Sequence, residues 1–128
     1  MRTLKYIGLT LLSGIYLSCS SDDSFVQEQE AELLNRMLTE IETLASSVTC
    51  SDASEWTFTD YGSKACGGPV GYIAYATTID VDAFLQKVEA HKEAQEAFNR
   101  KWGIASDCLF PLPPADVVCE NGMPVFVY

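Results

Sequence analysis

The chain has 128 residues with 8 basic and 18 acidic side chains, which gives a formal net charge of −10 at pH 7. This length predicts one domain, and an apolar content of 48% is typical of a folded protein rather than a disordered one. Such an acidic surface repels phosphate backbones and anionic lipid headgroups, which argues against nucleic-acid binding and leaves solubility as the simplest interpretation of the charge.

The first residues have the composition of an export signal. Arg2 and Lys5 give a short basic start, an apolar run follows over residues 6–17, and Ser18-Cys19 ends it. At about 1.5 Å per residue, this run covers roughly 18 Å, which is too short to cross the ~30 Å hydrocarbon core of a membrane. We therefore expect residues 1–18 to be a signal peptide.

Two short motifs specify the kind of signal. Tyr16-Leu17-Ser18-Cys19 resembles a bacterial lipobox, with Tyr16 where an aliphatic residue is usual, and residues 20–24 (SSDDS) resemble the surface-export signal of lipoproteins of the Bacteroidota group. The resemblance covers residues 1–24. It implies cleavage before Cys19, lipidation of the Cys19 thiol, and anchoring by acyl chains in the outer membrane with exposure at the cell surface. An ordinary secretory signal with a later cleavage site is the alternative.

After the signal, residues 19–24 are expected to be a lipidated polar tether and residues 25–128 a single globular domain. Ser24 and Gln27 have the spacing of a capping box, and apolar residues then recur every three or four positions. This periodicity predicts an amphipathic helix over about 24–46. Alternation over 56–59 predicts a half-buried strand, and the apolar run 70–77 predicts a central strand covered on both faces.

The second half of the chain is expected to contain a helix followed by two strands. Asp80 is placed to cap a second helix over about 81–102, which Gly103 ends, and a proline-rich connector follows over 104–116. Residues 117–120 and 125–128 flank Asn121-Gly122, a strong hairpin signal. Pro124 cannot donate to a ladder, so the last strand is an edge or the turn is wider. The order α-β-β-α-β-β predicts an α+β fold, with a small antiparallel sheet of about four strands and two helices.

The cysteines predict two disulfides. Of the five cysteines, lipidation would use Cys19 and leave Cys50, Cys66, Cys108 and Cys119, and an even number in an exported domain is typical of disulfide bonding. Three pairings are possible. The lowest cost of loop closure favours Cys50–Cys66 and Cys108–Cys119. There is no Cys-x-x-Cys motif and no close ligand spacing, which argues against redox and zinc sites.

A second resemblance covers most of the predicted domain. It rests on four segments: Trp56-x-Phe58, residues 62–69 (GSKACGGP), residues 71–75 (GYIAY) and Ser106-Asp107-Cys108. This pattern is similar to one found in small disulfide-bonded lipoproteins of the same bacterial group. It implies a shared fold and carries no activity with it.

No convincing catalytic set emerges, and we expect no metal or cofactor. The only histidine, His91, lies in the second predicted helix near the apolar stripe, which is typical of a packed side chain, and Asp60 is the one carboxylate in a partly apolar setting. Exposed aromatic side chains remain candidates for holding a sugar or a peptide, although most are expected to be core residues.

The leading hypothesis is a non-enzymatic accessory or binding module, displayed at the cell surface by its lipid anchor. The second is a small disulfide-bonded inhibitor of a foreign protease or lysozyme, and the third is a small hydrolase. An exposed loop at 62–69 or 108–116 would favour the inhibitor, because rigid loops bind at low entropy cost. A deep pocket that holds His91 or Asp60 would favour the enzyme.

Overall fold

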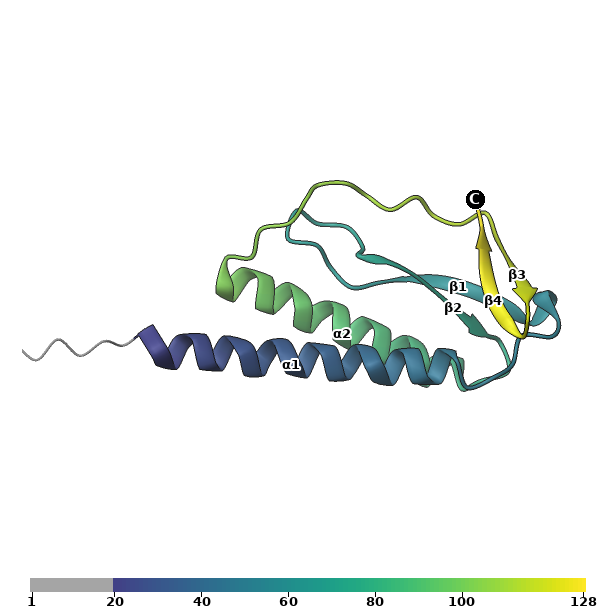
Figure 1. Cartoon of the computed structure of the whole chain (residues 1–128), viewed down its shortest axis with the longest axis horizontal. Helices are drawn as coiled ribbons and strands as arrows, with labels where there is room; N and C mark the ends of the chain where they lie inside the picture. Colours follow the sequence, from purple (N-terminus) through teal and green to yellow (C-terminus); the bar gives the residue numbers. More distant parts are fainter. Residues whose placement is uncertain (1–19) are drawn as a thin grey trace, which may run out of the picture.

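A computed structural model describes residues 20–128 of the chain (Figure 1). The elements follow the predicted order: α1 (Ser20–Ala45), β1 (Trp56–Tyr61), β2 (Gly71–Ala76), α2 (Val81–Trp102), β3 (Asp116–Glu120) and β4 (Met123–Val127), with a short 3₁₀ helix over Ala53–Glu55. The α+β class is therefore confirmed. The predicted signal peptide and the lipidation site Cys19 lie outside the described residues.

The start of α1 differs from the prediction. Residues 20–24, for which we expected a tether, form the first turns of the helix, so Ser24 lies within α1 rather than at its cap. The two carboxylates of this segment, Asp22 and Asp23, fall in the first helical turn, where negative charge is favourable at the positive end of the helix dipole. The acidic residues that resemble an export signal thus also suit a helix start.

The two helices lie side by side and form one layer (Figure 1). Ion pairs between Glu40 and Lys87 and between Glu30 and Lys101 show that the helices run antiparallel. The limits of α2 agree with the prediction: the Asp80 carboxylate accepts a hydrogen bond from the Ala83 N–H at 3.0 Å, and Gly103 ends the helix with a φ of 59°.

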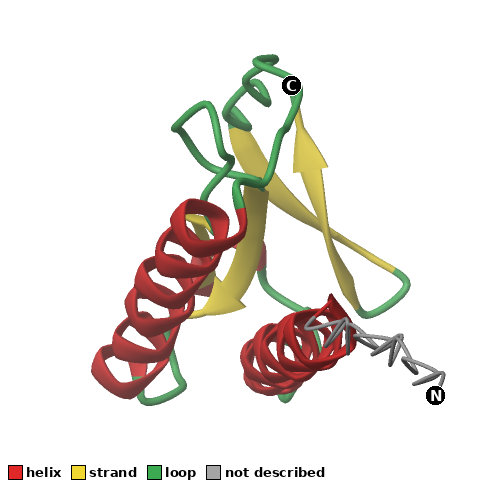
Figure 2. Ribbon diagram, turned by 90° about the vertical axis from the view of Figure 1, so that its left-hand side faces the viewer, coloured by secondary structure: helices red, strands yellow, loops and turns green. Residues whose placement is uncertain are grey.

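The four strands form two separate antiparallel hairpins, β1–β2 and β3–β4, rather than one sheet (Figure 2). Successive side chains of β2 face opposite sides: Tyr75 packs with Ile41 and Phe84 of the helices, whereas Ala76 packs with Trp56 and Val117. Strand β2 is therefore covered on both faces, as predicted, but it pairs only with β1. The second hairpin stacks on the face of the first and does not extend its edge.

The β3–β4 turn confirms the sequence signal. Asn121 and Gly122 have φ values of 51° and 80°, and Glu120 pairs with Met123, which defines a two-residue turn with both central residues in the left-handed region. Pro124 pairs with Cys119. Since pairs alternate in an antiparallel ladder, this pair is a non-hydrogen-bonded one, and the missing N–H of Pro124 is not needed by β3.

The predicted disulfide pairing is wrong. The bonds join Cys50 to Cys119 and Cys66 to Cys108, with Cα–Cα distances of 5.3 and 5.5 Å. Strand β1 separates Cys50 from Cys66 and spans roughly 20 Å, so these two residues lie at opposite ends of the strand. The extended segment after Cys108 likewise carries the chain away before it reaches Cys119. Short separation along the chain predicted the wrong pairs because an extended segment lies between the two cysteines of each predicted pair.

Candidate binding surface

Three large apolar side chains are exposed within four residues of the segment between α2 and β3. The exposed fractions are 76% for Leu109, 64% for Phe110 and 75% for Leu112. Single exposed apolar residues are common on soluble proteins, whereas a contiguous group of them is typical of an interaction site. We call residues 109–112 the apolar loop.

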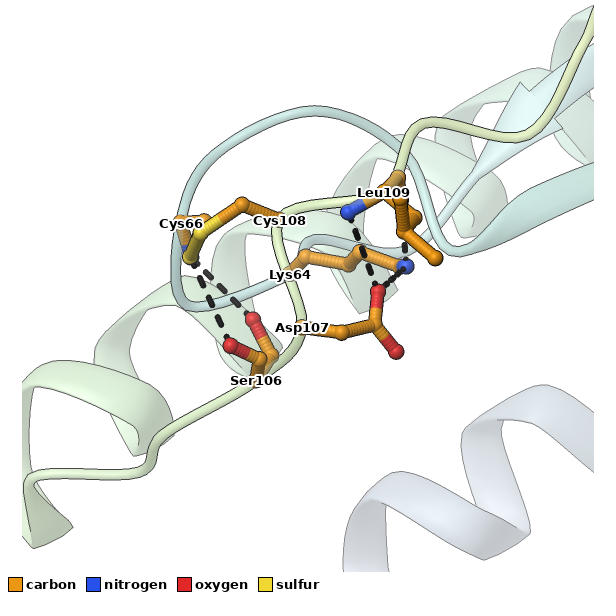
Figure 3. Close-up of polar contacts among 6 residues, drawn as sticks. All are labelled: Lys64, Cys66, Ser106, Asp107, Cys108 and Leu109. Carbon is orange, nitrogen blue, oxygen red and sulfur yellow. Dashed lines mark hydrogen bonds and ion pairs between the residues drawn. A yellow bond between two sulfur atoms is a disulfide. The ribbon is translucent and has the colours of Figure 1, made fainter.

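The start of the apolar loop is fixed by a disulfide and by one lysine (Figure 3). Cys108 is bonded to Cys66, whose N–H donates to Ser106 Oγ at 3.2 Å. The Lys64 ammonium donates to the Asp107 carboxylate and to the Leu109 carbonyl, both at 2.6 Å. The turn after β1 and the segment after α2 are therefore crosslinked by a covalent bond and by charge-assisted hydrogen bonds.

Asp107, just before the apolar loop, accepts a further hydrogen bond in this network. Its Oδ1 also accepts the Leu109 N–H at 3.2 Å. The hydrogen bond from Lys64, followed by that from the Leu109 backbone, lowers the pKa of the Asp107 carboxyl below its ordinary value. The carboxylate therefore keeps its charge to a lower pH than an ordinary aspartate, and it holds the backbone at the base of the apolar loop.

A close approach of backbone and ring fixes Phe110. Gly67 and Gly68 have φ values of 88° and 79°, which favour glycine. A Cβ atom at Gly68 would lie 2.6 Å from Cδ1 of the Phe110 ring, whereas one at Gly67 would meet nothing within 4 Å. Both glycines thus lie beside the Cys66–Cys108 disulfide with positive φ, and the close approach is at Gly68. Phe110 rests on Gly68 and remains mostly exposed.

The far end of the apolar loop is also tied down. Pro111, Pro113 and Pro114 restrict φ, and Pro114 is buried. The Ala115 N–H then donates to the Val127 carbonyl at 2.7 Å, beside the exposed C-terminal Tyr128. The apolar loop is therefore exposed in its side chains and held at both ends of its backbone.

The two residues considered for catalysis do not come together. His91 is buried within α2, with 3% of its surface exposed, which confirms it as a packed histidine, and desolvation by burial lowers its pKa. Asp60 is exposed on β1 opposite Tyr72. His91 lines a cleft between the helices whose lining residues include no Asp, Glu, Ser or Cys. This is not a charge-relay arrangement.

The aromatic side chains mostly serve the core. Trp56 and Tyr75 are buried, and the Trp102 indole N–H donates to Glu30 at 2.7 Å. Two aromatic residues that are exposed are Tyr128 and Phe110 of the apolar loop, and the exposure of Phe110 was not predicted from the sequence. The available signal was the stretch 110–113 (FPLP), in which apolar residues alternate with prolines that prevent burial in a regular element.

Comparison of the chain with known protein families, with curated proteins and with solved structures finds no match. Within residues 20–128, no group of three or more His, Cys, Asp or Glu side chains is placed to hold a metal ion. No helix in the part of the chain that the structure describes combines the length and apolarity needed to cross a membrane.

Proposed function

We propose that this chain is a lipid-anchored protein of the cell surface that binds another protein through the apolar loop, without catalysing a reaction. The observation that carries the proposal is the exposure of Leu109, Phe110 and Leu112 on a backbone held by the Cys66–Cys108 disulfide and by Lys64. Burying a large apolar side chain contributes about 1.5–3 kcal/mol. Three such side chains can therefore supply a substantial part of a binding free energy.

Preorganisation supports the same conclusion. A flexible segment loses conformational entropy when it binds, whereas a loop already held in one conformation avoids most of that cost. The apolar loop has a disulfide before it, three prolines within and after it, and a backbone hydrogen bond to β4 at its end. Such a loop has little further order to gain on binding.

The proposed localisation rests on the N-terminal sequence. The basic start, the apolar run over residues 6–17 and the lipobox-like residues ending in Cys19 support cleavage before Cys19 and lipidation of its thiol. We propose localisation at the outer membrane with exposure to the medium. Intact mass of the membrane fraction should show loss of residues 1–18 and added acyl chains, and Cys19→Ala should abolish the anchoring. A protein that still begins at Met1 would contradict this localisation.

Inhibition of a foreign hydrolase is the second candidate. The observation that favours it is the position of the prolines: Phe110 and Leu112 are each followed directly by a proline. Proteases bind substrates in an extended form and use backbone N–H groups that a proline lacks. The apolar loop can therefore occupy an apolar cleft and be a poor substrate there. Inhibition of a purified protease or lysozyme, lost in Phe110→Ser, would support this candidate.

Photo-crosslinking on intact cells tests the proposed function. A photoreactive phenylalanine at position 110 should crosslink one protein, and an excess of unlabelled chain should compete. The triple change Leu109→Ser, Phe110→Ser and Leu112→Ser should abolish that competition. The matched control, Phe25→Ser with Leu33→Ser, alters exposed apolar residues of α1 and should compete normally. Equal competition by both variants would overturn the assignment to the apolar loop.

A further inference from the structure

A second feature of the molecule is a cleft that no residue of the apolar loop lines. Between α1 and α2 is a cleft of about 290 Å³, covered by the end of β1, by Val70 and by Ile104. We call it the His91 cleft. Its apolar lining residues are Ala31, Leu34, Leu38, Val70, Phe98 and Ile104, and its polar lining residues are Asn35, Tyr61, His91, Gln95 and Asn99.

The imidazole of His91 lines this cleft and lacks a hydrogen-bond partner at one nitrogen. The residue is 97% buried, and its Nδ1 has no hydrogen-bond partner among the described residues. A neutral imidazole has one donor and one acceptor nitrogen, so an unpartnered Nδ1 is unsatisfied in either tautomer. Buried polar groups in folded proteins nearly always have a partner, and an exception calls for a specific explanation.

The cover of the cleft is built from defined hydrogen bonds. Gln95 Oε1 accepts the Ser63 N–H at 2.7 Å, and Asn99 Nδ2 donates to the Ser63 carbonyl at 2.9 Å. These bonds fix the backbone that follows Tyr61 and leave the other amide atom of each side chain for a further partner. At Gly62, whose φ is 73°, a Cβ atom would lie 2.8 Å from Gln95 Oε1, so glycine is required for this approach.

The lining also defines the kind of molecule that fits. No charged side chain lines the cleft, so an ion would lose its hydration without gaining a counter-charge. A cavity of roughly 150 Å³ lined by apolar side chains holds benzene, and the His91 cleft is larger. A hydroxyl group both donates and accepts, and can therefore pair with the edge of the imidazole that lines the cleft in either tautomer.

We infer that the His91 cleft binds a small neutral ligand with an apolar body, whose single hydroxyl group hydrogen-bonds the imidazole of His91. This inference is independent of protein binding through the apolar loop, because none of residues 109–112 lines the cleft. The bound ligand would pack on Leu34, Leu38 and Phe98. The neighbouring amides of Gln95 and Asn99 would add polar contacts without adding charge.

Phenol and toluene are the probes, because they have nearly the same shape and only phenol has a hydroxyl. The measurement is an NMR titration of the purified full-length chain with both disulfides formed. Phenol should cause saturable shifts at cleft residues, with a Kd on the order of 1 mM for so small a molecule. Toluene should bind about tenfold more weakly, which is the usual effect of one missing neutral hydrogen bond.

Two variants test the geometry. His91→Phe keeps the size of the side chain and should lower phenol affinity to that of toluene, while toluene affinity stays unchanged. Leu38→Trp should fill the cleft and abolish binding of both probes, whereas Leu33→Trp, at an exposed position of α1, should not. Nuclear Overhauser contacts between phenol and the Leu34 and Leu38 methyl groups of the unmodified chain provide the same evidence if Leu38→Trp does not fold.

Three results would overturn the inference. The first is the absence of saturable phenol shifts at the cleft. The second is equal affinity for phenol and toluene, which would mean that the imidazole hydrogen-bonds water only. The third is unchanged phenol affinity in His91→Phe, which would assign the hydroxyl to another group.

Discussion

The two disulfides lie in regions of opposite character. Cys50 is 2% exposed and packs with Trp56, Ala76 and Val117, so its bond to Cys119 belongs to the core between the hairpins. Cys66 and Cys108 are both exposed, and their bond holds the apolar loop. The comparison teaches that the same kind of covalent bond can stabilise a core at one end of a domain and hold an exposed loop at the other.

The largest expected effect is on the buried disulfide. The double change Cys50→Ala and Cys119→Ala removes a crosslink between residues 69 apart, and the entropy regained by the unfolded chain lowers the free energy of unfolding by about 4 kcal/mol. The cavity left by the sulfur atoms costs about 1 kcal/mol more. Urea unfolding should show a loss of this size in the free energy of unfolding. A loss below that of the exposed disulfide would reverse the comparison.

The exposed disulfide should be the first to be reduced. Thiol exchange requires access of a thiolate to the sulfur atoms, which both Cys66 and Cys108 permit and Cys50 does not. With a graded thiol reductant and alkylation, Cys66 and Cys108 should be labelled before Cys50 and Cys119. Amide exchange should then accelerate over residues 105–112 and remain slow in α2. Simultaneous labelling of all four cysteines would show that the two ends are not independent.

Two adjacent glycines give an intermediate effect with an internal control. Gly67→Ala and Gly68→Ala both place a Cβ atom in a left-handed conformation, at a cost of about 1–2 kcal/mol each. Only Gly68→Ala also displaces the Phe110 ring. Both variants should lose similar stability by thermal unfolding, but only Gly68→Ala should lose competition in the crosslinking assay. Equal competition by the two variants would show that binding does not depend on the position of the Phe110 ring.

His91 should make stability depend on pH. Burial lowers its pKa in the folded state, so the unfolded chain takes up the proton first as pH falls below about 6.5. The contribution of neutral His91 to the free energy of unfolding is therefore fully present above that pH. It is lost as pH falls, by at most about 1.4 kcal/mol per pH unit for one proton. Urea midpoints of the unmodified chain and of His91→Phe should diverge between pH 7 and 5. Parallel curves would contradict the burial of a neutral imidazole.

The smallest effect concerns Lys64. Lys64→Met removes its bonds to the Asp107 carboxylate and the Leu109 carbonyl and leaves the disulfide in place. Amide exchange of residues 107–110 should accelerate slightly, and the Asp107 pKa should rise toward its ordinary value, since Lys64 is the main cause of its depression. The pKa can be followed by carboxyl carbon NMR. An unchanged Asp107 pKa would assign its depression to the backbone alone.

Local signals predicted the regular elements well. Asp80 and Gly103 marked the limits of α2, and Asn121-Gly122 marked the second hairpin, because each acts through its nearest backbone neighbours. The disulfide pairing failed because it depends on where the strands carry the chain, over separations of 69 and 42 residues. The apolar loop was expected to be a connector, and its exposed side chains became evident only when no other element covered them.

Pro124 affects how readily strand β4 pairs with strands of other chains. Strand β4 is an edge, and its outward residues Met123, Val125 and Val127 are apolar, a combination that invites pairing with strands of other chains. Because Pro124 occupies a non-hydrogen-bonded position, the donor it lacks is the one that a foreign strand would need. Strand β4 therefore resists pairing with a foreign strand at Pro124, although its exposed side chains are apolar.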